Sequence, residues 1–591
     1  MNKGFLPASA EEMERRGWKE PDIVLITGDA YVDHPSYGTA LIGRVLEYAG
    51  FRVGIIAQPD CSRTDDFKRL GRPKLFFGVT AGNLDSMVAN YTANRKIRTG
   101  DDYSPGGRAG LRPDRATIVY TNKIKEAFPG AVVVIGGMEA SMRRLAHYDY
   151  WSDTVRRSVL FDAKADILVY GMGERQITEI ARRLRQGDPI KALDDIRGTV
   201  TARGDLSGID GYIEIPSFDS VKSDKDAFNK ALKTVYSQAD PFRGRTIVQR
   251  HGDRFAVHHP PELPLKTGEM DKLYSLPYLR KPHTIYDGIG AIPGFEMVRF
   301  SVTSHRGCPG GCNFCSLYLH QGRIVQSRSE RSIVEEISEI SRDKDFRGTV
   351  TDIGGPTANL YRARCERWTD RGACEGKHCL TPAKCKDLTL GYPEMMKLWR
   401  SVKDIGRVKH VFTGSGVRYD LLTDKGSDGY FNALCKEHIS GQLKVAPEHS
   451  EEAVLKLMNK PSFKVYENFL NKFGAMNGRL RKRQYLVNYL ISAHPGARLE
   501  DALRLSLELI KLDIHPEQIQ DFIPLPMTVS GGMYYTERDP FTGRPVYVAK
   551  GERERKLQRA LLQYKQPRNR RYVLEALRKL GRMDLKTVFL H

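Results

Sequence analysis

The sequence predicts an α/β protein in which a doubly wound parallel sheet precedes a complete or partial α/β barrel. In the first third of the chain, short apolar runs rich in β-branched residues alternate with amphipathic segments. That alternation is typical of strands and helices in a parallel sheet. A second alternating series begins at Met297, and its strands end in polar or Gly-rich loops, as at the mouth of a barrel.

The first series predicts the doubly wound sheet. Its expected strands are DIVLITG from Asp22, RVGIIAQ from Arg52, KLFFGVT from Lys74, AVVVIGG from Ala131 and ADILVYG from Ala165, with a helix over GTALIGRVLEYAG. Ligands of such sheets bind at the carboxyl ends of the strands. The residues expected along that rim are Asp29, Asp33, His34, Gly136, Gly137 and Glu139. Ligand binding and ordinary loop chemistry are alternatives for them.

The second series predicts the barrel. Its expected strands are VRFSVTS, GTVTDIGG, HVFTGSGV, GQLKVAPEH, YLVNYLIS and IQDFIPLP, with helices near residues 331–344, 393–403 and 499–512. We therefore expect a Rossmann-like domain over residues 1–190, a connector with a few strands of its own over 191–293 and the barrel over 294–530, with a Cys-rich insertion at 360–388. Residues 531–591 are expected to form a basic C-terminal extension.

The composition is that of an ordinary globular protein, with 591 residues of which 40% are hydrophobic. The first 20 residues contain no apolar signal segment, and no apolar run reaches the roughly 18 residues of a membrane span. We therefore expect a cytoplasmic protein that does not enter a membrane. The net charge of +21 favours polyanionic partners, and residues 551–591 hold 12 Lys or Arg against 4 Asp or Glu. Solvated helix faces are the alternative explanation of that charge.

The nine cysteines are distributed unevenly. Cys61 and Cys435 stand alone, and the other seven lie between Cys308 and Cys385. In a reducing compartment, clustered cysteines are more often metal ligands or catalytic groups than disulfides.

The first cysteine group is Cys308, Cys312 and Cys315, spaced C-x3-C-x2-C directly after the expected strand VRFSVTS. Thiolates suit iron-sulfur clusters or zinc. A closed zinc site needs four ligands, so three cysteines on one short loop favour a cubane with one iron left open. A zinc site or free thiols are the alternatives. Phe314, just before the last cysteine, is expected to pack against the cluster and exclude water.

The segment CPGGCNFC resembles the signature of radical S-adenosylmethionine (SAM) enzymes. The resemblance implies that the first cysteine group holds a [4Fe-4S] cluster whose fourth iron is chelated by SAM. One electron then cleaves SAM to methionine and a 5'-deoxyadenosyl radical. It also implies that Gly354 and Gly355 of DIGGPTANLY contact the methionine amino group through their backbone, with Pro356 in place of the usual acid. Lys444 and Glu448 of KVAPEH are candidates for ribose or carboxylate contacts, or for ordinary surface charge.

The chain resembles one family more closely, the YgiQ family of radical SAM proteins. The similar segments include ITGDAYVDHPSYGTALIGRVLE, GGMEASMRR, RGCPGGCNFCS, GSGVRYD and YYTERDPFTGRPVYV, and the match runs from about Gly17 to Lys565. The resemblance implies an N-terminal domain similar to cobalamin-binding Rossmann-like domains. The usual cobalamin signature D-x-H-x-x-G is absent, because Asp33 and His34 are adjacent. We therefore expect another ligand or substrate there.

The second cysteine group is Cys365, Cys374, Cys379 and Cys385, spaced C-x8-C-x4-C-x5-C in the insertion. Four thiols in a short segment without a core of its own predict a structural zinc ion or a second iron-sulfur cluster. Free or paired cysteines are the alternative.

The sequence thus predicts a radical SAM enzyme of unknown substrate and catalytic residues, reduced by a donor such as flavodoxin or ferredoxin. RNA is a candidate substrate because of the basic runs Arg479–Arg483 and Arg568–Arg571. Against RNA, the methylthiolating relatives carry a second three-cysteine set in the N-terminal domain, where this chain has only Cys61. The alternatives are an iron-sulfur electron-transfer protein and a zinc-stabilised nucleic-acid-binding protein.

Overall fold

The computed structural model describes residues 4–516 and 518–590. The chain divides into two compact units. The first comprises Met1–Ser301, Leu319–Gly322 and Asp370–Gly372, and the second comprises Val302–Tyr318, Arg323–Thr369 and Ala373–His591. Within the described ranges, no helix combines the length and the apolarity that crossing a bilayer requires.

The first unit is built on a nine-stranded sheet. Its parallel part runs in the order β3 (Val53–Ala57), β1 (Ile23–Thr27), β4 (Phe76–Thr80), β5 (Val133–Ile135) and β8 (Ile167–Val169). In chain order this is the flavodoxin-like arrangement 2-1-3-4-5, in which the switch point for ligands lies between the first and third strands. Here that point is the edge between β1 and β4. The doubly wound sheet predicted from the sequence is confirmed, with every expected strand present.

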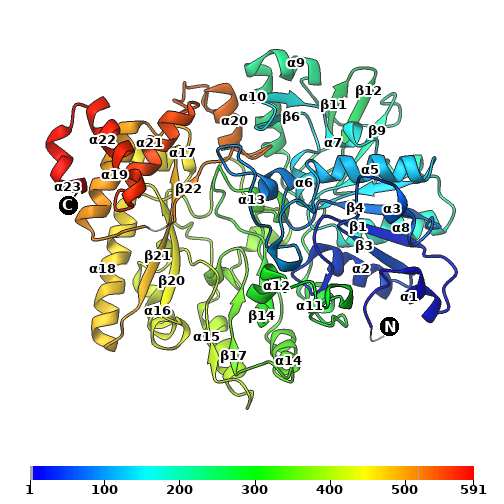
Figure 1. Cartoon of the computed structure of the whole chain (residues 1–591), viewed down its shortest axis with the longest axis horizontal. Helices are drawn as coiled ribbons and strands as arrows, with labels where there is room; N and C mark the ends of the chain where they lie inside the picture. Colours follow the sequence, from blue (N-terminus) through cyan, green and yellow to red (C-terminus); the bar gives the residue numbers. More distant parts are fainter. Residues whose placement is uncertain (1–3, 517, 591) are drawn as a thin grey trace. The chain divides into compact units, whose positions relative to one another are not determined.

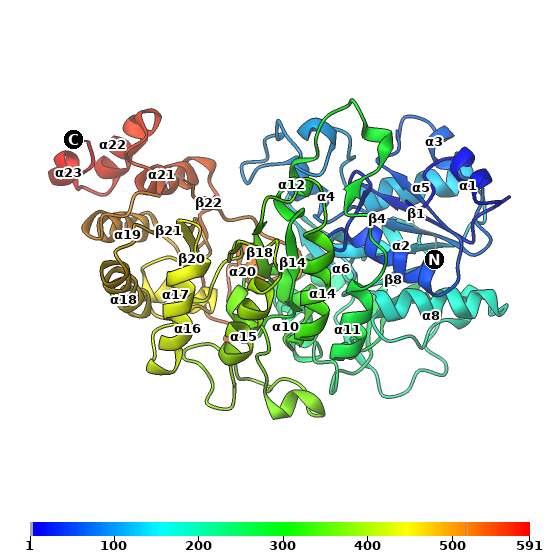
Figure 2. The ribbon, with the colours of Figure 1, turned by 90° about the horizontal axis from the view of Figure 1, so that it is seen from below.

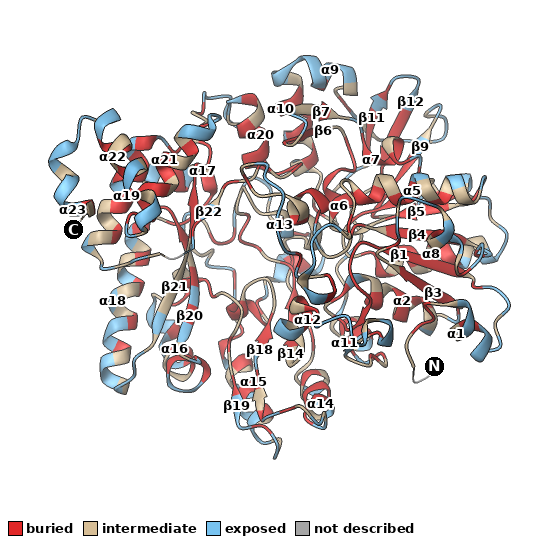
Figure 3. Cartoon of the chain, in the orientation of Figure 1, coloured by how far each residue is buried: buried red, intermediate tan, exposed pale blue. Residues whose placement is uncertain are grey.

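Helices cover both faces of this sheet (Figures 1 and 2). On one face, α2 (Gly38–Tyr48) and α8 (Glu174–Arg185) bury Leu46, Ile177 and Ile180 against strand residues such as Leu25 and Ile55. On the other, α5 (Ala116–Ala127) packs on β4 and on α3 (Asp65–Lys68). Since both faces are covered, the central strands are buried along almost their whole length, as Figure 3 shows for β1, β4 and β5. That burial explains why they read as continuous apolar runs.

The strands between residues 191 and 293 extend the same sheet. β9 (Thr199–Arg203) pairs antiparallel with β8, and β12 (Arg254–His258), β11 (Ile247–His251) and β10 (Ile213–Ile215) follow it outwards. The sequence prediction treats this region as a connector with a few strands of its own. The strands are present, but their partner is the preceding sheet, a long-range pairing that local periodicity does not encode.

The second unit contains a partial barrel. β14 (Ser301–Thr303) pairs with β18 (Asp352–Gly354), and β17 (Thr349–Val350) pairs with β19 (His410–Val411). A parallel bridge from Val417 to Val445 joins this part to β20 (Gln442–Glu448), which pairs in parallel with β21 (Tyr485–Ser492) and then β22 (Gln520–Asp521). The strands therefore follow one another in chain order, as in an α/β barrel.

The helices between these strands agree with the sequence prediction to within a few residues: α14 (Glu330–Ile340), α15 (Tyr392–Lys403) and α19 (Leu499–Lys511). α18 (Phe463–Leu480) is a further long helix, whose outer face is exposed in Figure 3. The expected strand VRFSVTS differs. Val298 ends helix α12 (Pro293–Val298), and the strand begins only at Ser301. Pro293 stands in the first turn of that helix, where proline favours a helix start.

The C-terminal extension is helical and packs on the barrel helix α19. α21 (Glu552–Leu562), α22 (Arg570–Lys579) and α23 (Lys586–Leu590) share with α19 an apolar cluster that includes Leu503, Leu557, Leu561, Val573 and Leu577. Figure 2 shows α19, α21 and α22 side by side.

Candidate functional site

The first cysteine group lies on the loop from Gly307 to Cys315, between β15 (His305–Arg306) and α13 (Ser316–Gln321). The amide of Cys315 donates to the Cys312 carbonyl at 3.0 Å, which curls the end of the loop. The three thiols lie close enough to act on one another electrostatically. Burial, reinforced by the other two thiols, raises the pKa of Cys315 to about 12, and burial also raises the pKa of Cys308.

The end of α17 (Glu452–Met458) anchors this loop. The backbone amide of Asn313 donates to the Met458 carbonyl at 3.0 Å, and its side-chain amide donates to the Leu457 carbonyl at 2.8 Å. Asn459, which ends α17 in a left-handed conformation, donates from Nδ2 to the Gly311 carbonyl at 2.7 Å. The loop is therefore fixed on both sides of Cys312.

Arg418 places a buried positive charge beside the first cysteine group. Its guanidinium donates to both carboxylate oxygens of Asp420, and Nη1 lies 2.7 Å from the position of a Cβ on Gly310. Its backbone is held by Asn359, which accepts from the Arg418 amide and donates to the Arg418 carbonyl, each at 2.9 Å. These hydrogen bonds connect the segments GSGVRYD and DIGGPTANLY, and they hold the positively charged guanidinium of Arg418 close to Cys308 and Cys312.

Gly354 ends β18 and Gly355 follows it, and both lie in close contact with side chains. A Cβ on Gly355 would lie 2.5 to 2.8 Å from three ring atoms of His305. A Cβ on Gly354 would lie 2.1 Å from Oδ2 of Asp352 and 2.2 Å from Oγ of Ser415. The His305 ring is fully buried, and burial lowers its pKa to about 4 although the ring interacts with the backbone of Thr357. Only glycine allows backbone and ring to approach this closely.

Phe314 and the segment KVAPEH occupy the same region of the barrel. Phe314 packs edge-on against His494 at the end of β21, with ring centroids 6.1 Å apart. Glu448 is buried with φ at +66°, and its carboxylate lies 3.8 Å from the Lys460 ammonium. Its Oε2 has no hydrogen-bond partner within residues 4–516 and 518–590. Lys444 of the same strand is exposed. The structure thus separates the two KVAPEH candidates, and only Glu448 belongs to the buried surroundings of the loop.

The acidic rim residues of the N-terminal sheet are paired within the protein. Asp29 accepts from Arg112 at 2.8 Å and from the Asn83 amide at 2.7 Å. Burial, which outweighs the nearby Arg112, raises the pKa of Asp29 to about 6. The remaining acids are paired as follows: Asp33 with Arg44, and Glu139 with the amides of Ser86 and Thr117. Gly137, with φ at +84°, leaves room for Thr80.

His34 is buried, and both of its ring nitrogens are engaged. Nδ1 accepts from the Ser36 amide at 3.1 Å, and Nε2 lies 3.0 Å from Nη1 of Arg280. Burial lowers its pKa well below the usual value. Both ring nitrogens are therefore engaged by residues of the first unit. Gly136 adopts an extended conformation at the start of helix α6 (Gly137–Met142).

The second cysteine group lines one small cavity in the insertion, with Trp368 and Leu388 among the other lining residues. Within residues 4–516 and 518–590, no three His, Cys, Asp or Glu side chains have the spacing of ligands to a single metal ion. Neither the first nor the second cysteine group therefore has three described side chains at single-ion spacing. Cys61 is half-buried and Cys435 is buried.

Sequence reasoning missed three residues around the first loop: His305, Arg418 and Asn459. Arg418 lies in GSGVRYD, a segment that the family resemblance includes, and this was the available signal. His305 and Asn459 carry no comparable signal, because a histidine beside a loop or an asparagine after a helix is common.

Comparisons with known proteins support the family resemblance. A family model described as radical SAM N-terminal matches residues 5–301, and one described as a domain of unknown function (DUF3362) matches residues 517–588. A UPF0313 protein of Clostridium botulinum (strain 657 / Type Ba4) is 49% identical over 584 residues, covering 99% of this chain and 91% of the relative. A UPF0313 protein of Methanosarcina acetivorans is 50% identical over 606 residues, covering 98% of this chain and 81% of the relative.

Among solved structures, the radical S-adenosylmethionine methyltransferase TsrM from Kitasatospora setae, with tryptophan substrate and a SAM analogue bound, aligns with a TM-score of 0.48. The sequence identity is 13%, and the alignment covers 86% of this chain and 75% of TsrM.

Proposed function

We propose, from the premise that this chain belongs to the UPF0313 or YgiQ family, that Cys308, Cys312 and Cys315 hold a [4Fe-4S] cluster that binds and cleaves SAM. The match to the radical SAM N-terminal model over residues 5–301 identifies the chain as a radical SAM enzyme. The observation that carries the proposal is the gathering of three thiols, without a fourth, on one anchored loop beside a buried arginine.

The donor set fits such a cluster. Three soft thiolates suit iron, and their number leaves one coordination position for SAM. The buried guanidinium of Arg418 lies beside Cys308 and Cys312 and offsets part of the negative charge of the thiolates. Among the residues that the structure describes, Oε2 of Glu448 has no hydrogen-bond partner, and it is a further polar atom that a bound polar ligand can satisfy.

The residues of this chain bind, orient and shield the reacting groups. Because Gly355 has no side chain, the buried His305 ring packs directly against the backbone of this turn. Phe314 and His494 form an apolar edge that limits the access of water. We assign Gly354 and Gly355 to SAM binding, and Phe314 to cluster shielding.

When bound, the cluster supplies the single electron that splits the sulfonium of SAM into methionine and a 5'-deoxyadenosyl radical. A low-potential donor such as flavodoxin or ferredoxin is required. Many such carriers are acidic, and the net charge of +21 favours an acidic partner. We propose a cytoplasmic location for this reaction.

Electron paramagnetic resonance of the reduced protein tests SAM binding at the open iron. Adding SAM is expected to change the g values of the cluster signal, and Cys312→Ala is expected to abolish the part of the signal that responds to SAM. The matched control is Cys61→Ala, which changes a cysteine outside both groups. A signal that SAM leaves unperturbed would favour the electron-transfer protein, in which cysteine ligates every iron. A colourless, zinc-containing protein would favour the nucleic-acid-binding scaffold.

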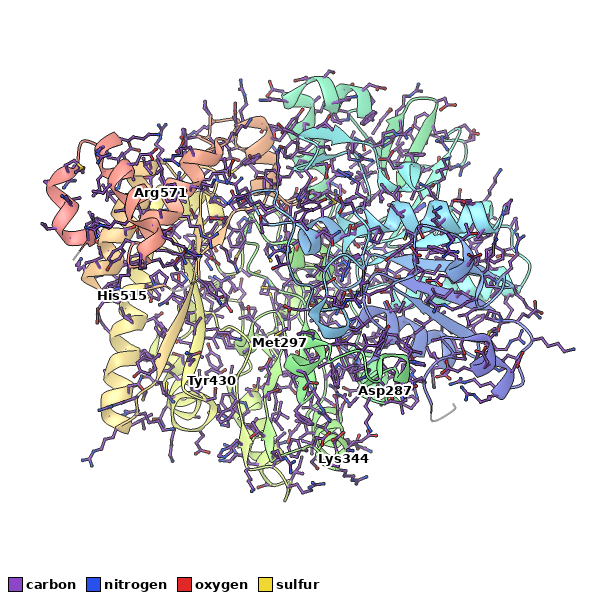
Figure 4. All side chains as sticks on the ribbon, in the orientation of Figure 1. Asp287, Met297, Lys344, Tyr430, His515 and Arg571 are labelled. Carbon is purple, nitrogen blue, oxygen red and sulfur yellow. The ribbon has the colours of Figure 1, made fainter. Side chains whose placement is uncertain are left out.

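RNA is the substrate class that the surface charge supports. Arg481, Lys482 and Arg483 are exposed just after α18, and Arg568, Arg570 and Arg571 are exposed around the start of α22, where Figure 4 labels Arg571. The Tyr485 side chain, 64% exposed, follows the first run and offers a ring on which a base can stack.

The salt dependence of tRNA binding tests this candidate. Changing Arg568, Arg570 and Arg571 together to Gln is expected to make the slope of log K against log salt shallower by about 2, because each lost phosphate contact removes roughly 0.7 from the slope. Arg331→Gln, at an exposed helix position with a local partner in Glu335, is the control. Affinity that stays constant between low and moderate salt would exclude this mode of RNA binding.

A further inference from the structure

The insertion between β18 and α15 is a closed loop with little regular structure. Two backbone hydrogen bonds of 2.9 Å between Arg364 and Thr389 pin its neck. Between them, Glu366–Thr369 forms one 3-10 turn, and residues 370–388, all of which the structure describes, contain neither helix nor strand. Loops of this length without secondary structure need another source of order, such as a metal ion.

The second cysteine group occupies the centre of this loop. All four cysteines line one cavity of about 10 Å³, room for roughly one water-sized sphere. The other three thiols are close enough to Cys379 to act on it electrostatically. Four thiols scattered over 21 positions of sequence, from Cys365 to Cys385, therefore converge on one point in space.

Charged groups of both signs lie around this point, and the Asp387 carboxylate accepts from the Cys385 thiol at 3.7 Å. Arg323 donates to the Cys374 carbonyl at 3.2 Å and to the Lys377 carbonyl at 2.8 Å, while its buried Nε has no hydrogen-bond partner in the part of the chain that the structure describes. Lys377 interacts with the Cys385 sulfur. An unpaired donor and a lysine beside the thiols suit a centre that carries negative charge, as four thiolates on a metal do.

We propose that Cys365, Cys374, Cys379 and Cys385 form a second metal site with four thiolate ligands. The size of the cavity favours a single zinc ion. Thiolates on one zinc lie about 3.8 Å apart, given Zn–S bonds of about 2.3 Å. Because no three thiols of the described chain have single-ion spacing, rotation about their Cα–Cβ bonds must bring the sulfurs inward. An iron-sulfur cluster uses the same four thiolates and requires the cavity to widen.

This second site lies next to the first cysteine group. The His378 ring lies 3.0 Å from the position of a Cβ on Gly311, within the first loop. Thr381 donates to the carbonyl of Asn459 at 3.2 Å, and Asn459 in turn donates to the carbonyl of Gly311. A metal that orders the insertion therefore also supports the loop that carries Cys308 and Cys312.

Metal analysis of a full-length variant without the first cysteine group tests the proposal. The variant Cys308→Ser, Cys312→Ser, Cys315→Ser is purified anaerobically after growth with both zinc and iron. We expect about one zinc per folded chain, or iron with matching sulfide, and either result supports the four-thiolate site. A folded variant with less than about a tenth of a metal equivalent would overturn the proposal. Because this variant lacks the first group, neither result bears on SAM cleavage.

Two further variants locate the metal. Adding Cys374→Ser and Cys379→Ser to the triple variant is expected to remove at least about nine-tenths of it, and adding Cys61→Ser is expected to remove none. Full metal content after Cys374→Ser and Cys379→Ser would overturn the proposal. Should that variant fail to fold, alkylation of the triple variant decides. While the metal is bound, the four cysteines are expected to react with an alkylating reagent at least about tenfold more slowly than after a chelator has removed the metal. Equal rates would contradict the site.

Discussion

At Gly355, a methyl group would meet three atoms of the buried His305 ring at 2.5 to 2.8 Å. Real Cβ atoms do not approach other atoms so closely, so Gly355→Ala must displace the ring or the turn. Because we assign this turn to the amino group of SAM, we expect SAM affinity, measured by equilibrium dialysis, to fall at least about tenfold.

The control for this variant is Gly474→Ala in α18, where a Cβ meets no atom within 4 Å. It is expected to leave SAM affinity unchanged and to stabilise the helix by about 0.5–1 kcal/mol. Wild-type SAM affinity in Gly355→Ala would remove this turn from the site.

Asp29 makes the stability of the N-terminal sheet depend on pH, and the sign of this dependence follows from the raised pKa of its carboxyl group. Burial raises its pKa to about 6 from 3.8. A carboxyl with a raised pKa in the folded state contributes stability that is fully present below pH 3.8 and is lost as the pH rises through 6. The free energy of unfolding of the wild type, relative to Asp29→Asn, is therefore expected to fall by up to about 3 kcal/mol between roughly pH 4 and pH 7.

Denaturation of the two proteins at each pH, followed by tryptophan fluorescence, measures this difference. Asp60→Asn is the control, because the hydrogen bonds of Ser62 lower the pKa of exposed Asp60, so its slope has the opposite sign. A difference between wild type and Asp29→Asn that does not change with pH would contradict the account of Asp29.

Residue types and spacing were sufficient to place the three thiols of the first group on one loop, and their role as cluster ligands stays a prediction. They were insufficient for His305 and Arg418. The His305 ring packs against Gly355, and Arg418 is held by Asn359, and both contacts join segments that are distant in the sequence. Single residues held by long-range packing carry no periodic signal.

At the scale of elements, Gly311 joins the first loop to the insertion. Its φ is +63°, and a Cβ there would lie 3.0 Å from Nδ1 of His378 and 3.3 Å from Nδ2 of Asn459. Gly311→Ala is therefore expected to combine left-handed strain of about 1–2 kcal/mol with a steric clash. Iron bound by the first group, measured per chain, is expected to fall by roughly half or more.

Gly322→Ala separates the two effects, because Gly322 has φ at +83° and no atom within 4 Å of its Cβ position. It is expected to retain the wild-type iron content. Equal loss of iron in both variants would mean that backbone strain alone is responsible and that the contact with the insertion is unimportant.

Most elements were predictable, because strands buried on both faces and amphipathic helices have strong periodic patterns. β1, β3, β4 and β5 all lie within their predicted segments. The exact start of the first barrel strand was not predictable, since an apolar run such as VRFSVTS fits the end of a helix as well as a strand. Here Val298 belongs to α12.

At the scale of the whole molecule, the chain joins a flavodoxin-like sheet and a partial barrel. The sequence predicted both, because each follows from the order of its elements. It did not predict that β9 to β12 continue the first sheet, since an antiparallel return such as β9 onto β8 depends on packing between distant segments. The division of the chain at residues 190, 293 and 530 stays a prediction.

The reductive cleavage of SAM is the reaction on which the whole account depends. The reconstituted protein, reduced anaerobically and supplied with SAM, is expected to form 5'-deoxyadenosine and methionine in equal amounts. Cys312→Ala is expected to lower the yield at least about a hundredfold, because a missing ligand prevents cluster assembly, whereas Cys61→Ala is expected to retain the wild-type yield. A fully loaded, reduced protein that forms no 5'-deoxyadenosine above the Cys312→Ala background would contradict the account.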